Sequence, residues 1–189
     1  YTEGGEPLHE ILKAASSDQG ATLLVPDLQR PYVWTPSQVT LLVDSLLRGW
    51  PFGTLLLWSV HKEELAGIPS RPFWRVVDRT GEFDDQQVGK SNPPAQFRMV
   101  LDGQQRLQSL LLAFGGDAWG FRLLDQEWSR VLDAERPKGK NAWRHWSLGH
   151  LCLDVWAFRE RLKNAGDIDS IDFRDVLSWV VQNPNEGRS

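Results

Sequence analysis

Nine consecutive residues decide the fold of this chain: Met99-Val100-Leu101-Asp102-Gly103-Gln104-Gln105-Arg106-Leu107. An apolar run leads into an Asp-Gly turn, and the turn opens into what we predict to be the start of a helix. The first turn of a helix leaves backbone N–H groups unpaired and carries partial positive charge. Gly103 lets a ligand approach the backbone closely, and Arg106 offers a planar set of donors that suits phosphate. The stretch therefore predicts a pocket for a phosphorylated ligand.

The flanking residues predict a strand–turn–helix unit. Residues 98–101 form the expected strand, and residues 54–60 are continuously apolar, which favours a neighbouring strand buried on both faces. The helix after the turn ends at Gly115-Gly116. Its apolar residues recur at helical spacing: Leu107, Leu110, Leu111 and Phe114.

An earlier helix has the clearest local signals. Thr35 is its expected N-cap, Pro36 its first residue and Gln38 its capping-box partner. Gly49 ends it. Its apolar stripe consists of Val39, Leu42, Val43, Leu46 and Leu47. The patterns also predict a helix over residues 7–15 and strands over residues 22–25 and 73–78.

The last third of the chain favours helix. Residues 121–134 and 151–162 carry apolar residues at helical spacing, and Asp172 is the expected cap of a last helix carrying Val176, Leu177 and Val180. We therefore expect an α+β chain, with a core over residues 1–118 and a mostly helical extension over residues 119–189.

Two motifs, in order, resemble one known family. The first is Val25-Pro26-Asp27-Leu28-Gln29-Arg30-Pro31-Tyr32-Val33-Trp34, followed by Pro51-Phe52-Gly53-Thr54-Leu55; the second is Asp102-Gly103-Gln104-Gln105-Arg106. Together they resemble the N-terminal domain of GmrSD-type restriction proteins, a branch of the ParB/sulfiredoxin-like fold. The resemblance covers roughly residues 20–115 and implies a small mixed sheet flanked by helices.

The resemblance also implies an enzyme that hydrolyses a nucleoside triphosphate with Mg²⁺. In that role Gly103 and Arg106 bind phosphate, Asp102 holds a hydrated Mg²⁺ or orients a water, and Gln104 and Gln105 hydrogen-bond the ligand. The chain has no Gly-rich loop ending in Gly-Lys-Ser/Thr, so hydrolysis would need a different phosphate cradle. The alternative is an ordinary junction, in which Asp102 caps the helix and Arg106 pairs with a surface carboxylate.

The first motif is a candidate DNA contact through Gln29, Arg30, Pro31 and Tyr32. Arg30 would bind phosphate as a second arginine, and an exposed Tyr32 beside it suits a DNA backbone or base. Pro31 and Tyr32 would also give an apolar surface, which a phosphorothioate sulfur would prefer. Alternatively, Tyr32 and Trp34 pack onto the helix that Thr35 caps.

Residues 136–146 form a cationic stretch interleaved with tryptophan. Lys138, Lys140 and Arg144 are candidate DNA-backbone contacts, and a solvated surface loop is the alternative. The chain as a whole has 21 Lys and Arg against 25 Asp and Glu, which excludes a uniformly basic nucleic-acid binder.

Several other classes of site are excluded by the residues. The single Cys152 allows neither an internal disulfide nor a cysteine-cluster zinc site, and its apolar neighbours favour packing over catalysis. No apolar run approaches the ~20 residues of a membrane span, and we expect a bacterial cytoplasmic protein without a membrane partner. Only Asp84-Asp85, near Asp102 in the expected fold, would support a metal-dependent nucleotidyl enzyme.

The function expected from all this is the sensor and NTPase module of an anti-phage restriction system. It would recognise modified DNA, phosphorothioate DNA first of all, and control a linked nuclease beyond residue 189. The linker-like end, residues 183–189, fits an excised piece of a longer protein. The alternative is a DNA- or protein-binding module of the same fold that hydrolyses nothing.

Overall fold

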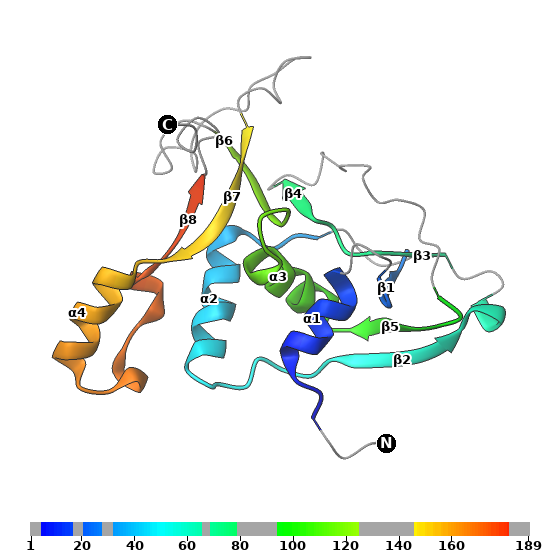
Figure 1. The fold of residues 1–189 in the computed structure, drawn as a ribbon, viewed down its shortest axis with the longest axis horizontal. Helices are drawn as coiled ribbons and strands as arrows, with labels where there is room; N and C mark the ends of the chain where they lie inside the picture. The colour runs from blue at the N-terminus through cyan, green and yellow to red at the C-terminus, as the bar shows by residue number, and fades with distance from the viewer. Residues whose placement is uncertain are drawn as a thin grey trace.

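The computed structural model describes residues 5–16, 21–27, 32–65, 69–78, 94–124 and 146–181. Within these ranges, helices and strands alternate along the chain, and the strands form two four-stranded sheets (Figure 1). The α+β class predicted from the sequence is confirmed. No helix in the described ranges is long and apolar enough to cross a membrane.

The first sheet has the strand order β2-β5-β1-β3. Its strands are β1 (Leu23–Pro26), β2 (Leu56–His61), β3 (Ser70–Arg71) and β5 (Gln96–Asp102). β1 lies parallel to β5, whereas β2 pairs with β5, and β3 with β1, in antiparallel fashion. The sheet is therefore mixed, as expected, and β2 and β5 are neighbours, as expected from residues 54–60 and 98–101.

The second sheet has the order β4-β6-β7-β8. Its strands are β4 (Val76–Asp78), β6 (Gly120–Leu124), β7 (Trp146–Leu153) and β8 (Leu177–Val181). β4 is parallel to β6, and the remaining pairs are antiparallel. A strand from before residue 118 thus pairs with a strand from after it.

Helix α3 (Gln104–Phe114) lies between the two sheets (Figure 1). Its Leu107 and Leu111 belong to the core cluster of the first sheet, with residues of β1, β5 and α1 (Leu8–Ser16). Its Leu112 belongs to the cluster of the second sheet, with Phe121 of β6 and residues of α2 (Pro36–Leu47). One helix therefore joins both halves of the core.

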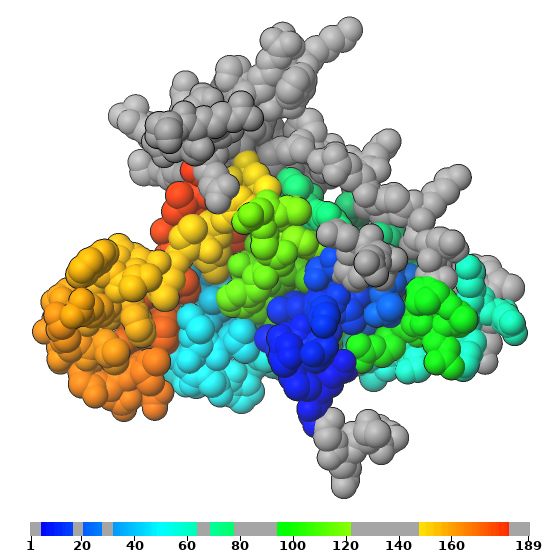
Figure 2. All heavy atoms as spheres, viewed as in Figure 1, coloured from blue at the N-terminus to red at the C-terminus, as the bar shows by residue number. Residues whose placement is uncertain are grey.

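The remaining helical elements lie nearer the ends of the molecule. They are α4 (Val155–Ala165) and the 3-10 turns η1 (Lys62–Leu65), η3 (Ile168–Ser170) and η4 (Phe173–Asp175). In the space-filling view α4 lies at one end, with α2 and α1 between it and the first sheet (Figure 2). None of the residues of α4 is buried.

The capping box predicted for α2 is present. Gln38 N–H donates to the Thr35 hydroxyl, and Thr35 N–H donates to Gln38 Oε1 at 2.8 Å. Pro36 occupies the first turn of the helix. These bonds satisfy backbone donors that the start of a helix leaves unpaired, which is why the sequence located this end correctly.

The expectation that residues 54–60 form a strand buried on both faces was wrong. β2 is an edge strand, with only β5 beside it in the first sheet. Leu56 is 56% exposed and Trp58 41% exposed, and only Val60 is buried in β2. A continuous apolar run does not separate a central strand from an edge strand with an uncovered apolar face.

Among the described residues after 118, two of the predicted helices are strands, and the third begins later than expected. Residues 120–124 form β6 rather than a helix, and Leu151 lies in β7, with α4 beginning only at Val155 behind the Asp154 cap. Asp172 caps the short η4, and β8 follows it. Cys152, expected to be packed, is exposed in β7.

The physical reason is a competing periodicity. Leu177, Trp179 and Val181 alternate along β8, and all three pack in the second-sheet cluster. Alternation of two residues places side chains on one face of a strand. The apolar residues of this segment fit helical spacing as well, so it is the pairing with β7 that makes the segment a strand.

Candidate functional site

The predicted turn lies where β5 ends and α3 begins. Gly103 is the N-cap residue of α3, with φ 85° and ψ 10°, and no side chain caps this end. A Cβ at Gly103 would lie 2.5 Å from Leu55 Cδ2 and 3.0 Å from the Thr54 carbonyl oxygen. Glycine is thus required here both by the left-handed backbone and by the close approach of the loop before β2.

Arg106 fixes that same loop. Its Nη1 donates to the Phe52 carbonyl oxygen at 3.0 Å, and its Nη2 lies 3.6 Å from Asp102 Oδ2. A Cβ at Gly53, where φ is 98°, would lie only 1.8 Å from Arg106 Nη1. The guanidinium therefore lies directly over Gly53, and it joins the loop at residues 51–55 to the Asp-Gly turn.

Gln105 and Ser109 hold the loop of the first motif. Buried Gln105 accepts from Val33 N–H through Oε1 at 3.2 Å. The Ser109 hydroxyl donates to the Gln105 carbonyl oxygen at 2.7 Å and lies 2.8 Å from the Tyr32 hydroxyl. The two motifs found in the sequence are thus bonded to each other through one face of α3.

Tyr32 is packed more than the DNA-contact hypothesis assumed. Its ring is half-buried, with its centroid 6.1 Å from that of Phe121, and burial raises the pKa of its phenol above the ordinary value. The packing alternative accounts for this ring. A direct contact of Tyr32 with DNA stays a prediction.

Asp102 is exposed at the turn, and Gln104 is half-buried. The Asp102 side chain is 69% exposed. The Gln104 amide has no hydrogen-bond partner among the described residues, and it lines a small open pocket. The described residues around that pocket are Val25, Tyr32, Arg71, Phe73, Trp74, Gln104, Gln105 and Gln108.

Arg71 and Trp74 form the far wall of the pocket, and the sequence did not single out either. The Arg71 guanidinium lies 4.5 Å from the centroid of the Trp74 ring. The Gln108 amide accepts from Trp74 N–H at 2.9 Å and donates to the Trp74 carbonyl oxygen at 2.8 Å. The available signal was the group of polar residues at helical spacing in the first half of α3: Gln104, Gln105, Gln108 and Ser109.

Other predicted site residues lie outside the described residues. These are Gln29, Arg30, Pro31, Lys138, Lys140 and Arg144, together with Asp84 and Asp85. Within the described ranges no group of three or more His, Cys, Asp or Glu is placed to hold a metal ion. Among those residues, Asp102 does not belong to such a group.

Comparison with known proteins agrees with the two motifs. The family model described as "GmrSD restriction endonuclease, N-terminal domain" matches residues 8–178. An uncharacterized protein of Methanocaldococcus jannaschii is 35% identical over 106 residues, which are 56% of this chain and 16% of that protein. The matched segment thus spans about a sixth of the relative's length.

Proposed function

The chain belongs to the family of GmrSD restriction endonuclease N-terminal domains, and we propose that this module of a restriction system recognises modified DNA and hydrolyses a nucleoside triphosphate. Hydrolysis would control a nuclease in another part of the protein. Phosphorothioate is the modification we propose first. The observation that carries the proposal is the start of α3, where Gly103 leaves the helix without a side-chain cap, Asp102 is exposed and Gln104 lines a small pocket.

The chemistry of this turn suits a triphosphate. Uncapped N–H groups and the partial positive charge of a helix start attract phosphate oxygens. Asp102, exposed beside them, would hold a hydrated Mg²⁺, which would supply positive charge to the phosphates. Gln104 adds an amide that can donate to the ligand or orient a water. Gln105 and Arg106 act differently, because their side chains already hold the two loops.

The bonds between the motifs support coupling of DNA recognition to hydrolysis. A ligand at the start of α3 and DNA at the first-motif loop would act on the same helix, since Gln105 and Ser109 join that loop to α3. A shift of the loop at Val33 would move Gln105, which is adjacent to Gln104. This short path is the proposed link between the two activities.

The test uses Asp102, which is exposed, and Gln104, whose amide has no hydrogen-bond partner among the described residues, because variants at these positions should fold normally. Asp102→Asn and Gln104→Ala are compared with Asp117→Asn, an exposed carboxylate beyond the other end of α3. We expect Asp102→Asn to lower turnover of Mg-GTP or Mg-ATP about 100-fold, with Gln104→Ala losing about 10-fold and Asp117→Asn nothing. Each protein is assayed alone and with unmodified, phosphorothioate and glucosylated duplexes, and its Tm is recorded. Wild-type turnover by Asp102→Asn at an unchanged Tm would contradict the proposal.

One observation favours a second candidate, a binding module without hydrolysis. Arg106, the cation of the second motif, is occupied with Phe52 and Gly53, and Asp102 is the one outward-facing carboxylate of the motif. A site with these groups can bind phosphate without activating a water. Nucleotide binding with no turnover, in the presence of every duplex, would establish this second function.

A further inference from the structure

The charge that meets the ligand at this end of α3 does not have to come from the motif arginine. Arg106 donates to Phe52 and covers Gly53. Arg106 is also not among the described residues that line the pocket at Gln104. Arg71, from β3, is in that lining, together with Gln104 and Gln105.

The size of the pocket limits what can enter it. Its cavity volume of about 10 Å³ accommodates one water-sized group. A nucleobase is far too large for this space, whereas a single oxygen of a phosphate fits. Arg71 and the amides of Gln104 and Gln105 are among the polar side chains that line a space of that size.

Arg71 is held in a fixed orientation. Its guanidinium stacks over the Trp74 ring, and its Nη1 donates to the Pro72 carbonyl oxygen at 3.2 Å. The backbone of Trp74 is in turn held at both its N–H and its carbonyl by the buried Gln108 amide. A stacked guanidinium keeps its N–H groups in the plane of the stack, where they can meet a phosphate oxygen with little further loss of entropy.

The Asp27 carboxylate competes for the same guanidinium. Asp27 Oδ1 lies 3.6 Å from Arg71 Nε, and the Asp27 side chain is 56% exposed whereas that of Arg71 is 15% exposed. Because this separation is long for an ion pair and water reaches the carboxylate, a charged ligand can compete with Asp27 for the guanidinium. Removing the Asp27 carboxylate should therefore raise the affinity for the ligand, and removing the Arg71 charge should lower it.

From these contacts we infer that Arg71 and Gln104 bind a phosphate oxygen of the ligand, and that Arg106 positions the loops instead. The inference rests on the proposed function for the presence of a phosphate ligand at this end of α3. The phosphate is that of a nucleoside triphosphate or of the DNA backbone. The inference assigns a second arginine, outside both motifs, to the site.

The experiment measures dissociation constants for Mg-GTP, Mg-ATP and a short phosphorothioate duplex, with the full chain and three variants. Arg71→Gln removes the charge, Asp27→Asn removes the competitor, and Arg159→Gln is the matched control. Arg159 also lies over a tryptophan, Trp156, but in α4 at the other end of the molecule (Figure 1). We expect Arg71→Gln to weaken binding about 10- to 100-fold and Asp27→Asn to tighten it about 2- to 5-fold, with Arg159→Gln unchanged. The ligand whose affinity responds identifies the source of the phosphate.

Three outcomes overturn the inference. Unchanged binding by Arg71→Gln would remove Arg71 from the site while leaving the proposed function intact. Weaker binding in both Arg71→Gln and Asp27→Asn would mean that the pair only supports the structure. Absence of all binding by the wild-type chain would remove the inference and the proposed function together. If Arg71→Gln has a lowered Tm, Arg71→Lys and Gln104→Ala replace it, and both are expected to weaken the same ligand.

Discussion

The two sides of α3 are held together by different kinds of contact. The motif side comprises the loops at residues 32–33 and 51–55 and the pocket wall at Trp74. Here side-chain hydrogen bonds of Gln105, Arg106 and Gln108 fix the backbone, and Ser109 holds the Tyr32 hydroxyl. On the second-sheet side, meaning β6 to β8 and η4, apolar contacts such as Phe121 against Trp179 dominate. Buried hydrogen bonds specify one arrangement, whereas apolar contacts mainly supply stability. The difference indicates that the contacts on the motif side fix where the two loops lie relative to α3.

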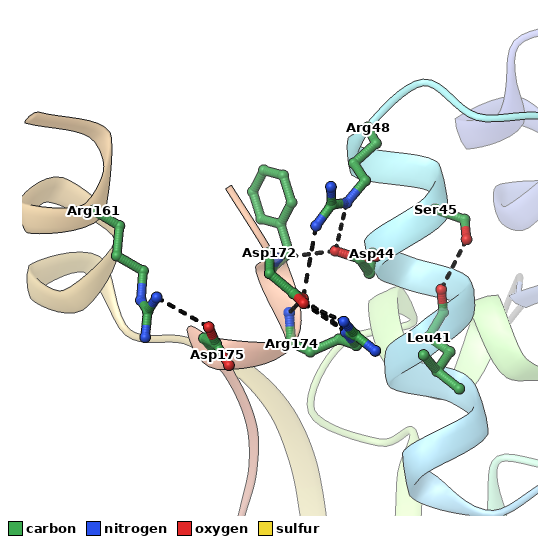
Figure 3. Close-up of polar contacts among 9 residues, drawn as sticks. Leu41, Asp44, Ser45, Arg48, Arg161, Asp172, Arg174 and Asp175 are labelled. Carbon is green, nitrogen blue, oxygen red and sulfur yellow. Dashed lines mark hydrogen bonds and ion pairs between the residues drawn. The ribbon is translucent and has the colours of Figure 1, made fainter. Parts of the chain in front are cut away.

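The contacts between the second-sheet side and α2 are also polar, and they include ion pairs. Figure 3 shows Asp44 and Arg48 of α2 directed toward Asp172 and Arg174. Buried Asp44 accepts from Arg48 Nε and from Phe173 N–H, both at 2.9 Å. The Trp179 indole also donates to the Pro36 carbonyl oxygen at 3.1 Å. These contacts join η4 and β8 to α2.

The largest effect should come from breaking this junction. Asp44→Ala leaves Phe173 N–H without its acceptor and Arg48 without its closest carboxylate. We expect the free energy of unfolding to fall by about 2–4 kcal/mol, because a buried pair is broken from one side. Urea denaturation measures it. Asp175→Ala, which removes the half-exposed pair with Arg161, is the control and should cost under about 1 kcal/mol. Equal losses would show that burial does not distinguish the two pairs.

A smaller loss of stability, with a larger effect on ligand binding, is expected on the motif side. Gly53→Ala places a Cβ where Arg106 Nη1 lies, and so displaces the arginine from Phe52. Gly49→Ala imposes the same left-handed strain, at φ 70°, with nothing within 4 Å of the new Cβ. We expect Gly49→Ala to cost about 1 kcal/mol and Gly53→Ala about 1–2 kcal/mol more. Thermal unfolding and nucleotide affinity, measured on both, isolate the contribution of Arg106. Identical results from the two variants would show that the Arg106 contact is unimportant.

The smallest effect is a dependence on pH at the junction. The hydrogen bond from the Arg174 guanidinium, helped by the charge of Arg48, lowers the pKa of Asp172 to about 2. Its contribution to stability is therefore complete above about pH 4 and is lost as the pH falls toward 2. Tm measured at pH 5, 3 and 2 should fall less steeply in Asp172→Asn than in wild type. The exposed Asp169→Asn should keep the wild-type slope, and a slope unaltered in Asp172→Asn would contradict the assignment.

Local signals predicted the motif side well. Thr35, Pro36 and Gln38 located the start of α2, and the Asp-Gly turn located the junction of β5 and α3. Each signal acts through bonds within a few residues, so the sequence contains it in full. The second sheet lacked such signals, because the choice between helix and strand at residues 177–181 depended on pairing with β7.

The candidate site shows the same division. Asp102 and Gln104 stand out in the sequence because they follow an apolar strand, and in the structure Asp102 is exposed and Gln104 lines the pocket. Nothing near Arg71 indicated that β3 would bring it beside Gln104, since β3 is a two-residue strand paired with β1. The structural task of Arg106 was equally hidden, because its partner Phe52 lies 54 residues away.

The interleaving of the two sheets has a consequence for synthesis on the ribosome. Leu23 of β1 pairs with Arg98 of β5, which emerges 75 residues later, and β2 pairs with the same strand. β4 can pair only after β6 has been made, and α3, which joins both cores, is made only after β5. A nascent chain therefore carries unpaired strands until more than half of it is translated. Such late, non-local closure is slow and exposes apolar surface, so this module should gain more than most from chaperones and slow translation.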